Sequence, residues 1–157
     1  MQKMTLKGIG VQLFISSIIY AAVILLLDKF IFGTYRLVLI FPLVNYILGL
    51  ILCCIGLVIL FLAFTKIRKA VENEKLVTSG IYSAMRHPIY GAWILFIVPG
   101  IVIINGQTLG ITIPVVMYVI FTNLIKKEEK VLVNLFGNDY LVYREKVHAI
   151  IPKFNFK

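Results

Sequence analysis

Four long apolar stretches with almost no charged residues dominate this chain and limit the folds open to it. The hydrocarbon core of a bilayer is about 30 Å thick, so a helix needs roughly 20 apolar residues to cross it. Of the 157 residues, 61% are hydrophobic and 15% are charged, which is far more apolar than a soluble domain of this length requires. We expect an all-α integral membrane protein that forms one domain over residues 1–157, with spans near residues 8–27, 37–64, 88–104 and 109–125.

Proline and glycine residues indicate where these spans begin and turn. Pro42 falls in the first turn of the second span, where its missing N–H is tolerated. In the third span, Pro99 and Gly100 predict a kink or a break. The segment Asn105-Gly106-Gln107 is typical of a tight turn. The third and fourth spans are therefore expected to form a hairpin whose uncharged loop scarcely leaves the membrane.

The first span has a second interpretation. Lys3 and Lys7 precede an apolar run, as they would in a removable signal peptide. That run is long, however, and no small-x-small cleavage pattern follows it. We therefore expect a retained helix.

Lysine and arginine residues are distributed very unevenly among the connecting segments. Cytoplasmic loops are enriched in these residues, and 14 of the 16 lie on one side of the predicted topology, whereas Lys29 and Arg36 lie on the other. We expect a multi-pass protein whose two termini, loop 65–87 and tail 126–157 are cytoplasmic. The loop and the tail would then lie on the same face of the membrane and form one active site.

The net charge of +9 does not by itself indicate a nucleic-acid partner. The cations flank spans instead of forming one soluble basic patch with interleaved aromatic residues. Anionic lipid headgroups are therefore the expected partners, and no nucleic acid is expected.

No metal-binding pattern is visible in the sequence. His87 and His148 are far apart, and there is no CxxC or HExxH spacing. Cys53 and Cys54 lie in the middle of the second span, where small packing residues are expected. We expect no metal site and no disulfide.

The middle loop changes character along its length. Residues 65–75 extend the helical pattern of the second span, whereas residues 76–80 are β-prone and end in a turn glycine. Pro88 holds His87 extended and suits the first turn of the third span. An ordinary interfacial linker explains the same residues, with Arg86 obeying the positive-inside rule and the tyrosines forming an aromatic belt.

The tail places two acidic residues at the membrane boundary. Glu128 and Glu129 precede an amphipathic helix that Gly137 is expected to cap, with a turn at residues 138–139 and a last short helix. In the simplest interpretation, the two glutamates only balance the positive charge of neighbouring lysines. At a membrane boundary, however, an acid pair is costly unless it is solvated or matched to a cation. A cationic ligand would meet that need.

Taken together, these two segments resemble a known family. The similarity rests on Leu76-Val77-Thr78-Ser79-Gly80-Ile81-Tyr82, Arg86-His87-Pro88-x-Tyr90, Glu128-Glu129-x-x-Leu132-x-x-x-Phe136-Gly137-x-x-Tyr140-x-x-Tyr143 and Ile151-Pro152. In this order and spacing, the chain from Glu74 to Pro152 is similar to the isoprenylcysteine carboxyl methyltransferase family. The first two spans match only as generic membrane helices.

The resemblance implies S-adenosylmethionine as methyl donor and S-adenosylhomocysteine as product, in a cytoplasm-facing pocket. It also implies a lipophilic or prenylated acceptor that arrives through a lateral opening between helices. The residues implied to hold the cofactor are Glu74, Lys75, Leu76, Val77, Tyr82, His87, Pro88, Ile89, Tyr90 and Glu128.

An acceptor that must lose a proton would need a base, for which His87 and Glu129 are the candidates. Arg86, Lys127 and Arg144 are the candidate cations for the acceptor. Prenylcysteine-directed relatives place an arginine four residues before the first glutamate of the acid pair, where this chain has Leu124. The acceptor thus stays open between a carboxylate, an enol or phenol of a polyketide-like or quinone-like molecule, and a phospholipid amine.

Two other classes of protein remain as alternatives. The Arg-His-Pro-x-Tyr pattern is similar to one in membrane sterol reductases that use NADPH, although those chains are much longer. A non-catalytic membrane adaptor is the other alternative.

Overall fold

The computed structural model describes residues 9–33 and 41–152, and the regular structure in those ranges is helical. The long helices are α1 (Gly10–Phe32), α2 (Pro42–Glu72) and α6 (Thr112–Lys146). Between α2 and α6, the chain forms α3 (Ile81–Ala84), α4 (Pro88–Gly91), the π-helical η1 (Ala92–Ile97), α5 (Val98–Asn105) and the 3₁₀ turn η2 (Leu109–Ile111). In the described ranges, four helical segments are long and apolar enough to cross a membrane, which confirms the predicted all-α membrane fold.

Two of the predicted spans are longer in the structure. Helix α1 continues five residues beyond the expected end at residue 27, and α2 runs eight residues past residue 64. Pro42 occupies the first turn of α2, as expected, while residues 37–40 of the predicted span lie outside the described residues. Of the helical pattern expected at residues 65–75, residues 65–72 form part of α2, and residues 73–75 lie beyond its end.

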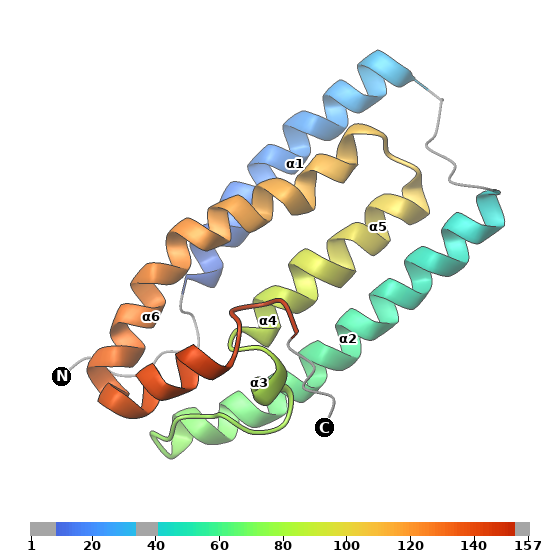
Figure 1. Ribbon diagram of the computed structural model, residues 1–157. Coiled ribbons are helices and arrows are strands. Elements are labelled where there is room, and N and C mark those ends of the chain that lie inside the picture. The colour runs from blue at the N-terminus through green and yellow to red at the C-terminus, as the bar shows by residue number, and fades with distance from the viewer. Residues whose placement is uncertain (1–8, 34–40, 153–157) are drawn as a thin grey trace.

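The fourth span and the tail helix are not separate elements, contrary to expectation. Helix α6 runs from Thr112 past residue 125, because no helix-breaking residue separates the span from the acid pair. The helical path is interrupted only at Gly137, whose φ of 54° and ψ of −129° are not helical. There the chain bends sharply (Figure 1), and helix resumes at once, so the turn expected at residues 138–139 is absent.

The third span is one helical path, made of α4, η1 and α5. Pro99 lies at the start of α5 and does not break that path, because the six-residue π-helix ends just before it. Gly106 adopts a left-handed conformation with φ of 63°, which confirms the tight turn before the fourth span.

Close helix packing holds α2 against the third span. A Cβ atom added to Gly49 would lie 2.6 Å from the carbonyl oxygen of Gly100, and one added to Gly56 would lie 2.5 Å from the Ile97 side chain. Small residues allow membrane helices to approach in this way. Cys53 and Cys54 are free thiols in the same helix, and the Cys53 sulfur lies 3.8 Å from the Ile97 carbonyl oxygen.

Helix α1 packs on the other side of the molecule, along α6 (Figure 1). At the end of the bundle away from the acid pair, the Asp28 carboxylate accepts a 2.6 Å hydrogen bond from the Leu109 N–H. The Tyr20 hydroxyl donates to Thr112 at 2.9 Å. These bonds join α1 to the hairpin between the third and fourth spans. At the opposite end, the beginning of α1, the ends of α2 and α6, and helices α3 and α4 come together (Figure 1).

Candidate active site

The segment that carries His87 is fixed by the chain that follows α6. The N–H of Arg86 donates to the His148 carbonyl oxygen at 2.9 Å, and the N–H of His87 donates to that of Ala149 at 2.8 Å. Pro88 then starts α4. Two backbone hydrogen bonds and a proline thus hold His87 at the base of the third span. The expected β-prone stretch at residues 76–80 forms no strand, and it is irregular up to Gly80.

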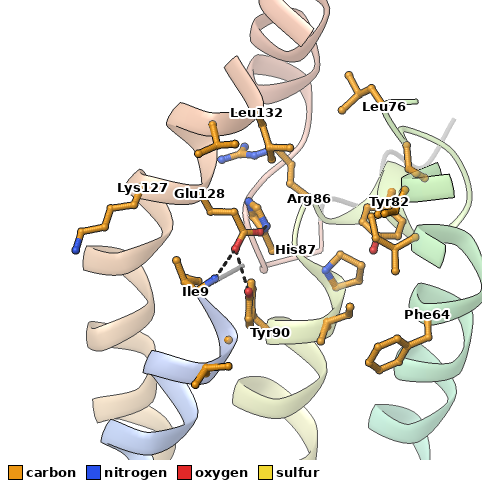
Figure 2. Close-up of a pocket in the computed structure, with 18 of the residues that line it drawn as sticks. Ile9, Phe64, Leu76, Tyr82, Arg86, His87, Tyr90, Lys127, Glu128 and Leu132 are labelled. Carbon is orange, nitrogen blue, oxygen red and sulfur yellow. Dashed lines mark hydrogen bonds and ion pairs between the residues drawn. The ribbon is translucent and has the colours of Figure 1, made fainter. Parts of the chain in front are cut away.

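Glu128 is the centre of a network that joins three helices. Its Oε2 atom accepts hydrogen bonds from the Tyr90 hydroxyl at 2.9 Å and from the Ile9 N–H at 3.1 Å (Figure 2). Its Oε1 atom lies 3.4 Å from Nδ1 of His87. The middle loop and the tail therefore meet at His87 and Glu128, as predicted.

Glu129 faces the other side of His87. Its Oε1 atom lies 3.3 Å from Nε2 of His87 and accepts two hydrogen bonds from Arg86, at 3.1 Å from Nε and 2.5 Å from Nη2. Nη1 of Arg86 also donates to the carbonyl oxygens of Arg144 and Val147. The guanidinium of Arg86 is therefore engaged by the protein on each of its nitrogens.

These contacts determine the charge of His87. His87 is only 6% exposed, and burial by itself lowers its pKa. Hydrogen bonds and charges from Glu128 and Glu129 outweigh that effect, so the pKa of His87 is raised above its ordinary value. Because each ring nitrogen faces a carboxylate oxygen, both contacts are hydrogen bonds only when both nitrogens carry a proton. The arrangement therefore favours the imidazolium.

A cavity of about 690 Å³ opens beside this network, and we call it the polar cavity. It extends from Tyr90 and the start of α1 to Tyr82 and the last turns of α6 (Figure 2). The predicted site residues that line it are Leu76, Val77, Tyr82, Arg86, His87, Pro88, Ile89, Tyr90, Lys127 and Glu128.

Four other predicted site residues do not line the polar cavity. Glu74, Lys75 and the side chain of Arg144 are exposed. Glu129 contributes indirectly, since it holds Arg86 and His87. The roles assigned to these four residues, like those of the residues that line the cavity, remain predictions.

The far end of the polar cavity is built from tyrosines. The Tyr143 hydroxyl donates to the Tyr82 carbonyl oxygen at 2.5 Å, which ties α3 to the last turns of α6. Burial raises the pKa of Tyr82, so its phenol stays neutral. The Tyr140 hydroxyl is buried with no hydrogen-bond partner in the described part of the chain, and Tyr140 lines the cavity.

A second space, the apolar groove, lies deeper in the bundle. Its volume is about 610 Å³, and side chains of α1, α2, the third span and α6 line it. Nearly all of that lining is hydrocarbon, since Ser17 and Gln107 are its polar members. The polar cavity and the apolar groove share the lining residues Phe14, Ile18 and Phe64.

Sequence reasoning missed the contribution of α1 and of the end of α2. The first turns of α1 and residues Phe64, Ile67 and Val71 of α2 line the polar cavity. In the sequence, an apolar residue that lines a cavity cannot be distinguished from one that faces lipid. Residues 148–149 were missed as well, because they hold the His87 segment through carbonyl oxygens, which every residue type supplies.

The side chains described in residues 9–33 and 41–152 include no group of three or more His, Cys, Asp or Glu able to hold a metal ion. The site as described consists of carboxylates, a histidine ring, a guanidinium and tyrosines around a cavity that shares lining residues with an apolar groove.

Comparison with known proteins places this arrangement among membrane methyltransferases. The sequence model of the isoprenylcysteine carboxyl methyltransferase family matches residues 37–134. Protein-S-isoprenylcysteine O-methyltransferase B of Arabidopsis thaliana is 35% identical over 118 residues, which are 73% of this chain and 59% of that protein. The human protein-S-isoprenylcysteine O-methyltransferase is 30% identical over 104 residues, 63% of this chain and 37% of that protein. The Xenopus laevis protein of the same name is 31% identical over 115 residues, which are 68% of this chain and 40% of that protein.

The chain thus spans between 37% and 59% of the length of these curated relatives. The matched region includes the Arg-His-Pro-x-Tyr segment and the acid pair. It also includes α2, which from the sequence alone resembled the family only as a generic membrane helix. The motif residues from Phe136 onward lie beyond it.

Proposed function

Since the chain belongs to the isoprenylcysteine carboxyl methyltransferase family, we propose that it transfers a methyl group from S-adenosylmethionine to an oxygen atom of a lipophilic acceptor. The relatives are named for methylation of protein S-isoprenylcysteine, so a carboxylate on a prenylated thioether is the first acceptor to test. The observation that carries the proposal is the polar cavity itself, where the acid pair and His87 meet beside an apolar groove.

The polar cavity suits S-adenosylmethionine in size and in chemistry. When bound, that molecule supplies an electrophilic methyl group on a sulfonium. Glu128 offers a carboxylate to its positive charge, and Tyr82 offers an aromatic face beside the apolar Leu76 and Val77. The residues proposed to hold it are those predicted residues that line the cavity.

The hydrogen bonds of His87 bear on the type of acceptor. A hydroxyl or amine acceptor must lose a proton, and an imidazolium has no free lone pair to accept it. A carboxylate is already ionised at neutral pH and needs no base. The site is therefore better suited to a carboxylate, and His87 is better suited to orienting the acid pair than to removing a proton.

The cations near the cavity differ in their availability to an acceptor. Arg86 is engaged by Glu129 and two carbonyl oxygens. Arg144 is exposed away from the cavity, and Leu124 is buried in the core between α1 and α6. Lys127 lines the cavity, although its ammonium points away from Glu128 in Figure 2. Among these residues, we propose Lys127 as the cation that approaches an acceptor carboxylate.

Alignment supplies most of the rate enhancement in this proposal. Holding two reactants in line replaces a bimolecular encounter, and oriented intramolecular reactions gain roughly 7–11 kcal/mol in this way. The apolar groove offers the acceptor's hydrocarbon a place beside the reacting group. We place the site on the cytoplasmic face, since the lysine and arginine residues gather at that end.

The first experiment is calorimetric titration of the detergent-purified protein with S-adenosylmethionine and S-adenosylhomocysteine. We expect both to bind the wild type and the exposed-surface control Glu145→Ala, and to bind His87→Ala and Glu128→Ala at least roughly tenfold more weakly. Transfer of a labelled methyl group to an S-farnesylcysteine derivative then tests the reaction.

Other outcomes identify the remaining classes of protein. Binding of NADPH instead of the methyl donor would point to a reductase. A folded protein that binds neither would be an adaptor. Methylation of phosphatidylethanolamine in preference to the cysteine derivative would indicate a phospholipid N-methyltransferase.

A further inference from the structure

The boundary between the polar cavity and the apolar groove is formed by three side chains from two helices. Phe14 and Ile18 belong to α1 and Phe64 belongs to α2, and these are the residues that line both spaces. Helix α1 packs on α6 and η2, whereas α2 packs on α4, η1 and α5. Side chains that reach from α1 and α2 therefore stand where the two spaces adjoin, and we call this boundary the neck.

The two aromatic sides of the neck are supported differently. The ring of Phe14 packs edge-on against Trp93, with ring centroids 5.2 Å apart and an interplanar angle of 81°. Trp93 belongs to the π-helix η1 and lines the groove. Phe64 is 54% exposed on α2. One side of the neck is thus held by an aromatic contact, and the other is a half-exposed side chain.

The volume of the groove corresponds to one hydrocarbon chain. If a methylene occupies about the same space as a water molecule, roughly 30 Å³, the 610 Å³ groove holds about 20 methylene-sized groups. That is one prenyl or acyl chain. The second chain of a glycerolipid would have to lie outside the groove, and the branch point that joins the two chains would then have to pass beside the neck.

We propose that Phe14 and Phe64 are specificity-determining residues that admit acceptors with a single hydrocarbon chain and reject acceptors with two. This inference rests on the proposed function, in that the reacting group lies in the polar cavity while the chain lies in the groove. Trp93 is a positioning residue in this scheme, because it acts by holding Phe14.

The first test compares two acceptors with the same reacting carboxylate, an S-farnesylcysteine and an S-diacylglycerylcysteine. The wild type should prefer the single-chain compound in kcat/KM. Phe64→Ala should reduce that preference roughly tenfold. Phe61→Ala is the matched control, since Phe61 is 69% exposed on the same helix and lines neither space. An unchanged preference in Phe64→Ala and Phe14→Ala would overturn the proposal.

The second test needs no methyl transfer. Trp93 is the single tryptophan of the chain, so its fluorescence reports on the groove. In bilayers, a cysteine thioether with one brominated alkyl chain should quench Trp93 saturably at low mole fraction. Its brominated diacylglyceryl counterpart should quench only in proportion to its concentration. Equal, unsaturable quenching by both would overturn the proposal, whereas saturable quenching without any methyl transfer would support the neck and refute the proposed function.

Discussion

The backbone N–H of Ile9 donates a 3.1 Å hydrogen bond to Oε2 of Glu128, so helix α1 begins on a carboxylate that α6 supplies. The first N–H groups of a helix have no partner within the helix, and a negative charge there also interacts favourably with the helix dipole. The same oxygen accepts from Tyr90. One carboxylate therefore holds the wall of the polar cavity in place and is also the proposed contact for the donor's positive charge.

Replacing Ile9 with proline tests this bond directly, because proline removes the N–H and Ile9 has a φ of −83°, near the value that proline prefers. We expect Ile9→Pro to be less stable than Ile9→Ala by about 1–3 kcal/mol, the usual cost of losing a hydrogen bond to a buried charged group. Chemical unfolding in detergent measures the difference. Ile9→Ala is the control for the lost side chain, and equal stability of the two variants would show that the hydrogen bond does not support α1.

His87 predicts the direction of a pH dependence. Its pKa in the folded protein is raised above the ordinary value of about 6.5 by Glu128 and Glu129, which outweigh burial. The folded state thus binds this proton more tightly than the unfolded state does. The stabilisation is fully present below about pH 6.5 and is lost as pH rises through the folded-state pKa.

Melting temperatures measured between about pH 5.5 and pH 9.5 test that direction. We expect the wild type to lose stability across the upper part of this range, and His87→Gln to lose most of that dependence. His148→Gln should behave like the wild type, because the His148 side chain is exposed and its carbonyl oxygen makes the contact to Arg86. A His87→Gln profile parallel to that of the wild type would contradict the imidazolium.

The helices were predictable from the sequence, because long apolar runs have few alternatives in a membrane. The positions of the helix ends were less predictable. Residues 28–32 continue α1 although Asp28 and Lys29 carry charge, since the Asp28 carboxylate finds a backbone partner at Leu109. The continuity of α6 past residue 125 was missed because polar residues end a span without ending a helix.

In the candidate site, the polar residues were easier to predict from the sequence than the residues that enclose the cavity. His87, Tyr90 and Glu128 carry polar groups that are unusual at a membrane boundary, so they stand out in the sequence. The start of α1 closes the cavity through a backbone N–H and apolar side chains, which look like any lipid-facing helix. Glu74 and Lys75 match the family pattern by position, yet both side chains are exposed.

Gly137 provides a test of the bend in α6. An alanine there would meet no atom within 4 Å, so any cost comes from the backbone, whose φ is 54°. We expect Gly137→Ala to destabilise the protein by about 1–3 kcal/mol and to weaken donor binding, because Tyr140 and Tyr143 follow the bend. Gly33→Ala is a matched control with φ of 58° and equally open space at the other end of the molecule. A similar loss of stability is expected there without loss of donor binding, and equal weakening of donor binding by both variants would contradict the role of the bend.

Chemical labelling can test the proposal that the end of the bundle with the polar cavity faces the cytoplasm. Lys146 at the end of α6 and Lys29 near the end of α1 are both exposed and lie at opposite ends of the bundle (Figure 1). In a Cys53→Ala, Cys54→Ala background, we introduce Lys146→Cys or Lys29→Cys and treat intact cells with a membrane-impermeant maleimide. Since positive charge is retained in the cytoplasm, Lys29→Cys should react in intact cells, whereas Lys146→Cys should react only after permeabilisation. The reverse pattern would place the polar cavity on the outer face, and the donor would then have to be available there.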